Sequence, residues 1–423
     1  MSEFEKIKGY KSIKVELERI CDVLKNTEKY TKLGVTTPGG LLLYGDPGVG
    51  KTLMANCLMK ESGRKVFTCR KDKPDGEFVR SIKKIYSEAS ENTPCIVFLD
   101  DMDKFENEDE FHPDADAYVA IQSCIDEYKG FDIFTLATAN FISKLPNSLM
   151  RAGRFDKKIE IENPRNDDAV EIVSYYLSQK SNVKNIDARL VAKILNGSSC
   201  AELETVINEA GLYAGYENKE FIEMDDIVKS CLRVLYDAPE SLSREEDDVK
   251  EQLAYHEAGH AVVSDILEPG SVSIVSIKKH DGTIGGLTGH ESKDKYFLSK
   301  TLMENRVMTL LAGRAGTEIV YGETDVGAGG DIQRAFKIVE RFVDDYAEFS
   351  FSNYNFGDDP SNSILAKNES AVSNEISRYY NKVKSILIKN RGFLDAVAKA
   401  LVEKQTLLDS DIQEIKKNFE IKM

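Results

Sequence analysis

The chain has 423 residues, which is too long for one ordinary hydrophobic core and predicts two or three domains. Hydrophobic residues make up 41% and charged residues 30%, a balance that excludes a wholly disordered or collagen-like chain. The formal net charge of −16 argues against nucleic acid or an anionic membrane as the main partner, because both bind basic surfaces. We therefore expect a soluble globular protein with no nucleic-acid partner.

The seven cysteines all lie within the first 231 residues, and none forms a close pair such as CxxC. Scattered thiols are typical of a reducing compartment. The chain has no run of 18 apolar residues, so we expect no membrane span. Its first 20 residues, "MSEFEKIKGYKSIKVELERI", lack the apolar core of a signal peptide, which favours a cytoplasmic location.

From residue 41 to about residue 140, short apolar segments alternate with segments of helical periodicity. We expect strands at "LLLYG", "KVFTC", "CIVFLDD" and "IFTLATAN", with a helix in each interval. Alternating strands and helices predict an α/β domain whose parallel sheet is covered by helices on both faces.

Two helix-breaking clusters, "ENPRNDD" (162–168) and "DAPESLSREEDD" (237–248), bracket a mainly helical stretch. Beyond residue 248 helical periodicity dominates, apart from a strand-turn-strand pattern over 271–290. These changes predict three domains, at residues 1–160, 161–240 and 241–423.

The first motif is "GDPGVGKT" (45–52), which fits GxxxxGK[ST] between a predicted strand and a predicted helix. Its glycines let the backbone approach phosphate oxygens, Lys51 would neutralise the β and γ phosphates, and Thr52 would ligate magnesium. The alternative is a glycine-rich turn before a helix, which the combined strand, loop, lysine and helix disfavour. The expected nucleotide-binding residues are Gly45, Asp46, Pro47, Gly48, Val49, Gly50, Lys51, Thr52 and Leu53.

Two acids follow the strand "CIVFL" about 45 residues later. Asp100 is expected on the magnesium side of the nucleotide, and Asp101 could orient the attacking water. Acids after a strand are more often a solvated turn or a helix cap. Together with the phosphate loop they favour an ATP-hydrolysing site.

The segment "TLATANFISKLPNSLMRAGRFDKKI" (135–159) resembles the second region of homology of AAA+ ATPases. The resemblance implies that Asn140 is a polar sensor at a strand end. It also implies that Arg151 and Arg154 act as arginine fingers on the γ-phosphate of a neighbouring subunit, and that the chain forms a homo-oligomeric ring, a hexamer. The alternative is that the two arginines are ordinary surface charges in a loop.

The second motif is "HEAGH" (256–260), which fits HExxH. On a helix the spacing places His256 and His260 on one face, where both can bind one zinc ion. Glu257 could then deprotonate a zinc-bound water. The alternative is two histidines that are merely packed or solvated on a helix.

A catalytic zinc site needs a third protein ligand. The residues alone leave six candidates open: Glu323, Asp325, Asp331, Glu340, His280 and His290. The segments "LAYHEAGHAVV" and "LLAGRAGTEIVYGETDVGAGGDIQRA" resemble the peptidase domain of the FtsH family, the AAA+ zinc metalloproteases. The resemblance implies Asp331 as the third ligand; the alternative is that Asp331 only caps the following helix.

This resemblance extends over nearly the whole chain. "FEKIKGYKSIKVEL" resembles the N-terminal segment of the family's ATPase, where the backbone from Ile7 to Gly9 would meet the adenine, and "NGSSCAELETVINEAGLYA" resembles its helical lid. The three domains would be the large ATPase domain (1–160), the lid (161–240) and a mainly helical peptidase (241–423). The implied cofactors are Zn²⁺, ATP and Mg²⁺, and the implied substrates are polypeptides.

Three departures from the family pattern matter. The family normally carries N-terminal transmembrane helices, whereas this chain begins at the ATPase, so we expect a soluble ring. Asp101 stands where the family has a glutamate, which predicts slow hydrolysis. The pore-loop region, "CRKDKPDGEF" (69–78), is charged and has no aromatic grip, because Phe67 and Phe78 are expected in a strand and a helix.

We therefore expect an ATP-dependent zinc endopeptidase that degrades unfolded or loosely folded proteins. The alternatives are a nucleotide-regulated remodelling or assembly protein, and a nucleotide-gated peptidase with weak unfoldase activity.

Overall fold

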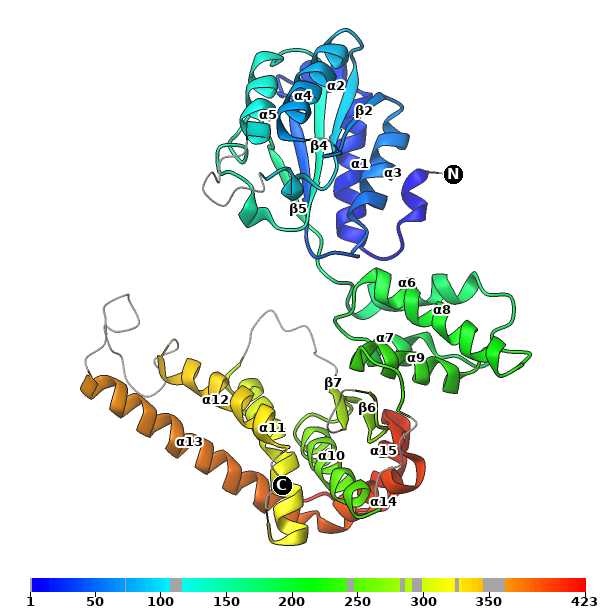
Figure 1. Cartoon of the computed structure of the whole chain (residues 1–423), viewed down its shortest axis with the longest axis vertical. Coiled ribbons are helices and arrows are strands. Elements are labelled where there is room, and N and C mark those ends of the chain that lie inside the picture. The colour runs from blue at the N-terminus through cyan, green and yellow to red at the C-terminus, as the bar shows by residue number, and fades with distance from the viewer. Residues whose placement is uncertain are drawn as a thin grey trace. The chain divides into compact units, whose positions relative to one another are not determined.

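The computed structural model describes residues 2–72, 74–106, 116–241, 247–281, 286–290, 299–323, 327–344 and 362–423. The chain divides into two compact units, Met1–Ser230 and Cys231–Met423. Figure 1 shows the elements of each unit along the chain. No described helix is both long and apolar enough to cross a bilayer.

The first unit contains a parallel sheet of five strands in the order β2-β3-β4-β1-β5. The strands are β1 (Gly40–Tyr44), β2 (Lys65–Cys69), β3 (Cys95–Leu99), β4 (Ile133–Ala139) and β5 (Lys157–Glu160). The central strands β1, β3 and β4 are mainly apolar and almost wholly buried because helices cover both faces of the sheet. The four predicted strands are confirmed. The edge strand β5 was not predicted, since its sequence "KKIE" is short and largely exposed.

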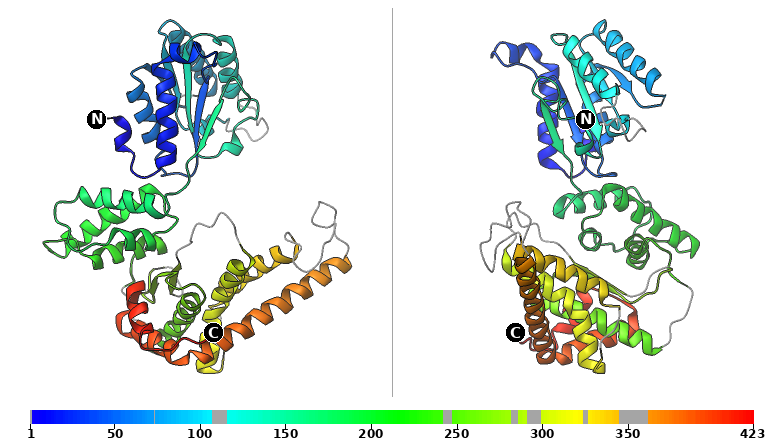
Figure 2. Two further views of the ribbon diagram at one scale, coloured as in Figure 1. Left: turned by 180° about the vertical axis from the view of Figure 1, so that it is seen from behind. Right: turned by 60° about the vertical axis from the view of Figure 1, so that its left-hand side comes forward.

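Helices α1 (Lys11–Lys25) and α3 (Lys51–Ser62) lie on one face of the sheet, and α4 (Asp75–Ser90) and α5 (Asp116–Glu127) lie on the other (Figures 1 and 2). The first unit also contains four short helical elements: η1 (Glu3–Lys6), α2 (Thr27–Thr31), η2 (Met102–Phe105) and η3 (Ile142–Lys144). The core between α4, α5 and the sheet is built from large side chains such as Phe78, Tyr86, Phe105 and Tyr118. The predicted α/β architecture is confirmed.

Four helices follow the sheet: α6 (Asn166–Ser178), α7 (Ala188–Ile194) and α8 (Cys200–Tyr216) in the same unit, and α9 (Met224–Tyr236), which spans the boundary between the two units. Helix α8 begins with a capping box, in which the Ser199 hydroxyl accepts from the Glu202 amide and the Glu202 carboxylate accepts from the Ser199 amide. This cap defines where the helix starts, which matters because residues at that point contact the phosphate loop.

The second unit is mainly helical, as predicted. Its helices are α10 (Asp247–Leu267), α11 (Lys300–Tyr321), α12 (Gly329–Asp344), α13 (Asn362–Lys389), α14 (Arg391–Lys404) and α15 (Asp409–Lys416). A small antiparallel sheet has the order β7-β6-β8, from β6 (Val272–Ser276), β7 (Leu287–His290) and β8 (Thr406–Leu408). Strand β8 was not predicted, because three residues are too few to show a period.

Helices α10 and α11 approach closely because both carry glycines where they meet. A β-carbon on Gly259 of α10 would lie 2.4 Å from the carbonyl oxygen of Ala312, and one on Gly316 of α11 would lie 2.7 Å from that of Tyr255. Both distances are shorter than a van der Waals contact, so only glycine allows this packing. The close approach brings α11 against the helix that carries HExxH.

Candidate nucleotide and metal sites

The phosphate loop connects β1 to α3. Gly45, Gly48 and Gly50 have φ angles of +144°, +84° and +96°, a region that L-residues with side chains rarely adopt. A β-carbon on Gly45 would lie 2.0 Å from the carbonyl oxygen of Ile161, so a side chain has no room there. The buried Lys51 ammonium donates to the carbonyl oxygens of Gly45 and Asp46, both at 2.8 Å. Burial lowers the pKa of Lys51, although nearby aspartates oppose that shift.

The other loop residues differ in their surroundings. Asp46, Pro47 and Gly48 are exposed, Val49 is fully buried, Thr52 is partly buried and Leu53 is exposed. The start of helix α8 contacts this loop, because the Ala201 amide donates to the Gly48 carbonyl oxygen at 3.1 Å. The thiol of Cys200 also lies 3.5 Å from the carbonyl oxygen of Val49.

The N-terminal segment expected at the adenine is tied to helix α6. Ile7 is buried, and Gly9 has a φ of +65° with its α-carbon against Asp168. The amide of Tyr10 donates to Oδ1 of Asp168 at 2.8 Å. The 3₁₀ turn before this segment, η1, packs on helix α3, which begins at Lys51.

Asp100 and Asp101 follow the carboxyl end of β3. The hydroxyl of Thr138 on the neighbouring β4 donates to Oδ1 of Asp100 at 2.9 Å and accepts from the Asp101 amide at 2.9 Å. Asp101 adopts the left-handed conformation (φ +54°), and its carboxylate pairs with Lys104 at 2.7 Å. Thr138 therefore positions both acids. Its role was not predicted from the sequence.

Asn140 lies directly after β4, at the strand end where it was expected. Its amide nitrogens both contact the buried Asp103: the backbone N–H donates at 2.9 Å and Nδ2 at 3.4 Å. Asp103 was missed in the sequence reading, although it stands only three residues after Asp100.

The two arginines of "RAGRFD" have different environments. Arg151 is exposed. The Arg154 side chain is only 13% exposed and forms a two-pronged pair with Asp126 at the end of α5, with Nε 3.1 Å and Nη2 2.6 Å from its oxygens. Arg154 also donates to the carbonyl oxygen of Ser148. The structure therefore holds Arg154 within its own chain and leaves Arg151 facing solvent.

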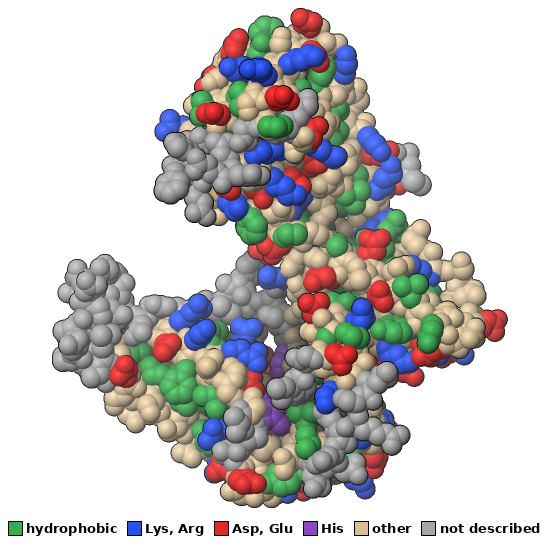
Figure 3. Space-filling model, viewed as in Figure 1, with side chains coloured by type: hydrophobic (Ala, Val, Ile, Leu, Met, Phe, Trp, Pro, Cys, Tyr) green, Lys and Arg blue, Asp and Glu red, His purple; other side chains and the backbone are tan. Residues whose placement is uncertain are grey.

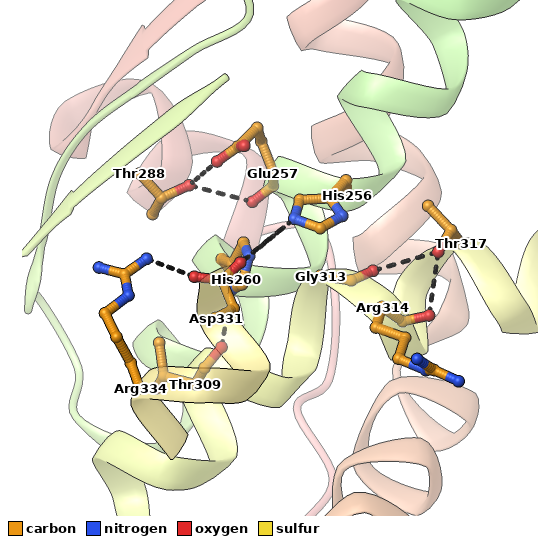
Figure 4. Close-up of polar contacts among 10 residues, drawn as sticks. All are labelled: His256, Glu257, His260, Thr288, Thr309, Gly313, Arg314, Thr317, Asp331 and Arg334. Atoms are coloured by element: carbon orange, nitrogen blue, oxygen red, sulfur yellow. Dashed lines mark hydrogen bonds and ion pairs between the residues drawn. The ribbon is translucent and has the colours of Figure 1, made fainter. Parts of the chain in front are cut away.

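In the second unit, His256 and His260 project from one face of α10, with their Nε2 atoms 3.1 Å apart (Figure 4). Both are mostly buried. Figure 3 shows histidine side chains (purple) on one face of the molecule. Nδ1 of His260 lies 2.7 Å from the carbonyl oxygen of Thr309 on α11. A carbonyl oxygen can only accept, so Nδ1 carries the proton and Nε2 is free to bind a metal.

Asp331, in the first turn of α12, meets the two histidines. Its Oδ2 lies 3.2 Å from Nε2 of His260 and 3.5 Å from Nε2 of His256, while its Oδ1 accepts from Arg334. Burial raises the pKa of Asp331, but the two neighbouring histidines and the charge of Arg334 outweigh it and leave the pKa well below its usual range. Helix α12 begins at Gly329, two residues before Asp331, and the carboxylate of Asp331 faces the two histidines.

The three donors fit a tetrahedral zinc ion. Ligands about 2.1 Å from zinc at tetrahedral angles stand about 3.4 Å apart. The observed separations are 3.1, 3.2 and 3.5 Å. Among the described residues, this is the group of histidine, cysteine and acidic side chains that could hold a metal ion.

Glu257 is buried beside this group and is held by strand β7. The Thr288 hydroxyl donates to its Oε2 at 2.6 Å (Figure 4). A β-carbon on Gly286, just before the strand, would lie 2.5 Å from Cγ of Glu257, so the backbone there passes directly against the side chain.

Gly313 on α11 lies equally close to the histidines. A β-carbon on Gly313 would stand 2.4 Å from Nε2 of His260 and 2.5 Å from that of His256.

The other described candidate ligands are not part of this group. Glu323 and Glu340 are exposed, and Asp325 lies outside the described residues. His280 stacks on Tyr236 with ring centroids 4.1 Å apart, and His290 contacts the Ser264 hydroxyl through Nδ1 at 3.0 Å. The structure therefore brings Asp331, and none of these other described candidates, into the group with the histidine pair.

The two aromatic residues that flank the charged segment 69–78 lie where they were expected. Phe67 is in strand β2, and Phe78 is a buried residue of α4 with its ring against Phe105. Phe78 is therefore part of the core.

The parallel sheet with its phosphate loop, followed by a helical unit with HExxH, defines an ATPase joined to a metallopeptidase. Residues 41–163 match the family described as ATPase family associated with various cellular activities (AAA), and residues 243–415 match peptidase family M41.

Similar proteins cover nearly the whole chain. It is 31% identical over 446 residues to "ATP-dependent zinc metalloprotease FtsH" of Caldicellulosiruptor bescii, a match that covers 97% of this chain and 71% of the relative. It is 28% identical over 426 residues to "ATP-dependent zinc metalloprotease FtsH 2" of Thermoanaerobacter sp., covering 97% of this chain and 82% of the relative. It is 29% identical over 469 residues to "ATP-dependent zinc metalloprotease FtsH 3" of Synechocystis sp., covering 99% and 74%.

The chain therefore belongs to the FtsH family of ATP-dependent zinc metalloproteases. It is both a protease and an ATPase, and its cofactors are Zn²⁺, ATP and Mg²⁺. The alternative of a remodelling protein without peptidase activity is not favoured.

Proposed function

We propose that the chain acts as a cytoplasmic homo-hexameric ring that uses ATP to deliver unfolded or loosely folded polypeptides to its zinc sites. The observation that carries the peptidase part is the convergence of His256, His260 and Asp331 beside the buried Glu257. The proposed boundaries are residues 1–160 for the large ATPase domain, 161–240 for the lid and 241–423 for the peptidase.

In this proposal His256, His260 and Asp331 hold the zinc ion. When bound, zinc lowers the pKa of a water molecule and polarises the scissile carbonyl group. Thr309 keeps the proton of His260 on Nδ1, and Arg334 occupies the second oxygen of Asp331. Both contacts orient the ligands without taking a coordination position.

Glu257 is the proposed general base. Its carboxylate accepts the proton of the attacking water and returns it to the leaving amine. The hydrogen bond from Thr288 fixes one carboxylate oxygen, which leaves the other to receive the proton. Burial of Glu257 beside the ligands keeps bulk water from competing with this hydrogen bond.

At the nucleotide site, Lys51 and the loop 45–53 would bind the phosphates, Thr52 and Asp100 would hold Mg²⁺, and Ile7 to Gly9 would meet the adenine. Lys51 already donates to loop carbonyl oxygens, so its ammonium must exchange these partners for phosphate oxygens. Asp101 would orient the attacking water, and Asn140, fixed by Asp103, would sense the γ-phosphate.

The ring part of the proposal rests on the arginines. The exposed Arg151 is free to act as a finger on the nucleotide of a neighbouring subunit, which supports the proposed ring. Arg154 would reach a neighbour's nucleotide only by leaving Asp126, or would serve by positioning Arg151.

The proposed cytoplasmic location rests on the cysteines. All seven are free thiols, and six of them are buried. Free thiols are typical of a reducing compartment.

The preference for loosely folded substrates rests on two residues and one segment. Asp101 is one methylene shorter than glutamate and is paired with Lys104, which predicts slow ATP turnover. The segment after β2 is charged, and hydrated charges grip an apolar polypeptide poorly.

The test compares degradation of casein and of a stably folded tagged domain, with ATP, with a non-hydrolysable analogue and with a zinc chelator. We expect ATP-dependent, chelator-sensitive casein cleavage and little loss of the folded domain. Glu257→Gln should abolish cleavage but keep ATP binding, and Asp101→Glu should raise ATPase turnover. Cleavage by Glu257→Gln would refute the general-base role, and efficient degradation of the folded domain would refute the substrate preference. Native mass measurement with zinc analysis tests the hexamer and the metal together.

A further inference from the structure

Arg70 is the first residue after strand β2, in the charged segment that departs from the family's pore loop. Strands β2 and β3 are parallel neighbours, with Cys69 opposite Leu99. The residues that follow them, Arg70 and Asp100, therefore emerge side by side at the carboxyl edge of the sheet. Nη2 of Arg70 lies 2.7 Å from Oδ2 of Asp100.

This pair occupies the remaining free oxygen of the magnesium-side aspartate. The Asp100 side chain is only 9% exposed, and its Oδ1 already accepts from Thr138 at 2.9 Å. A metal ion, or a water molecule bound to it, needs an oxygen of this carboxylate. Arg70 holds the other oxygen, Oδ2.

The same edge carries further cations. A pocket at this position is lined by Arg70, Lys71, Asp100, Asp101, Lys104 and Phe105. Lys104 pairs with Asp101 at 2.7 Å, so both acids expected at the ATP site have a cationic partner from their own chain. The Arg70 side chain is 64% exposed, which leaves it room to move away from Asp100 without disturbing the core.

We propose that Arg70 is an internal counter-ion of Asp100 that competes with Mg²⁺ for its Oδ2 oxygen, so that magnesium loading requires Arg70 to leave. The charged segment after β2 then has a role at the nucleotide site. Arg70 is a positioning residue in this scheme: it keeps the Asp100 carboxylate oriented and neutralised until the nucleotide-bound metal replaces it. The proposal depends on MgATP binding, and it depends neither on the peptidase centre nor on the ring.

The experiment titrates Mg²⁺ into the full-length protein at a fixed concentration of a fluorescent, ribose-labelled ATP analogue that is not hydrolysed. The chain contains no tryptophan, so the label supplies the signal. The variants are Arg70→Ala and Arg70→Lys. Arg80→Ala is the matched control, because it removes the same charge from an exposed position on α4 of the same domain.

We expect Arg70→Ala to lower the half-saturating Mg²⁺ concentration about three- to tenfold, which corresponds to about 0.7 to 1.4 kcal/mol. Arg70→Lys should give a smaller shift, because lysine keeps the charge but loses the planar fork. Arg80→Ala should match the unmodified protein. The difference between Arg70→Ala and the unmodified protein should shrink at high salt, because the pair is partly exposed and therefore screened.

Two results would overturn the proposal. An unchanged magnesium requirement in Arg70→Ala would show that the pair does not compete with the metal. A raised requirement would show that Arg70 assists magnesium or phosphate binding. Direct counting of free Mn²⁺ by electron paramagnetic resonance gives the same answer without the label, since Mn²⁺ takes the same oxygen ligands.

Discussion

The Thr288 hydroxyl donates a 2.6 Å hydrogen bond to Oε2 of Glu257, which joins the small antiparallel sheet to the HExxH helix. Strand β7 carries Thr288, and it pairs with β6 on one side. The position of the proposed general base therefore depends on a strand that lies outside the motif.

Replacing this hydroxyl should slow cleavage without removing the metal. Thr288→Val keeps the shape of the side chain but cannot donate, so we expect kcat/KM on a short peptide to fall about 10- to 100-fold. Zinc content should be unchanged, and Thr288→Ser should restore most of the activity. Loss of zinc in Thr288→Val would indicate a general disturbance of the site and would count against a specific role in orienting Glu257.

Gly313 should be required for zinc binding. A β-carbon there would stand 2.4 and 2.5 Å from the Nε2 atoms of His260 and His256, close to the length of a zinc–nitrogen bond of about 2.0 to 2.1 Å. We expect Gly313→Ala to force the two rings apart and to lose stoichiometric zinc, as measured by elemental analysis of the purified protein. Asp331→Ala should lose zinc as well, because it removes the third donor.

Gly316→Ala is the matched control for Gly313→Ala. It adds a methyl group to the same helix, 2.7 Å from the Tyr255 carbonyl oxygen, and so disturbs the contact between α10 and α11 without reaching the histidine nitrogens. We expect it to lower the melting temperature but to retain zinc. Equal zinc loss in both variants would attribute the effect to helix packing and would remove the specific role of Gly313.

We expect the two arginines to differ in role: Arg151 is catalytic, and Arg154 is partly structural. Arg151→Ala removes an exposed side chain, so we expect ATP hydrolysis to fall at least 100-fold while nucleotide affinity and melting temperature stay unchanged. Arg154→Ala breaks the pair with Asp126 and should also destabilise the ATPase unit by about 1 kcal/mol. Calorimetry alongside an ATPase assay checks both. Normal hydrolysis by Arg151→Ala would remove the argument for a shared active site.

His280 should make the peptidase unit less stable in acid. Burial against Tyr236 lowers its pKa from 6.5, while a hydrogen bond to the Lys278 carbonyl oxygen opposes the shift. The folded state therefore favours neutral His280, whereas the unfolded chain takes up the proton near pH 6.5. The stabilisation is complete above pH 6.5 and is lost as the pH falls toward the lower pKa of the folded state.

His280→Phe keeps the stacked ring but cannot titrate. Urea unfolding at pH 7.5 and 5.5 should therefore show a smaller loss of stability for the variant than for the unmodified protein. His290, whose pKa is also lowered, contributes equally to both proteins and cancels in the comparison. An equal loss of stability between pH 7.5 and 5.5 in both proteins would show that the pKa of His280 is the same in the folded and unfolded states.

The sequence by itself determined the elements with strong local patterns. Strands β1, β3 and β4 are buried and mainly apolar, β2 is a short run rich in β-branched and aromatic residues, and the phosphate loop is specified by glycines at positive φ followed by Lys51. His256 and His260 lie on one face of α10 because helical spacing alone places them there. These features depend only on residues close together in the chain, so pattern and spacing were enough.

Tertiary structure decided the features that join distant segments. Edge strands β5 and β8 have little local signal and form because partner strands offer unpaired backbone groups. Spacing cannot tell which acid reaches the histidines; packing of α12 brings Asp331 there, and α11 supplies the Thr309 carbonyl and the space at Gly313. The register of β2 against β3 likewise sets Arg70 beside Asp100. Each of these contacts forms only when several elements pack together, because no single segment contains both partners.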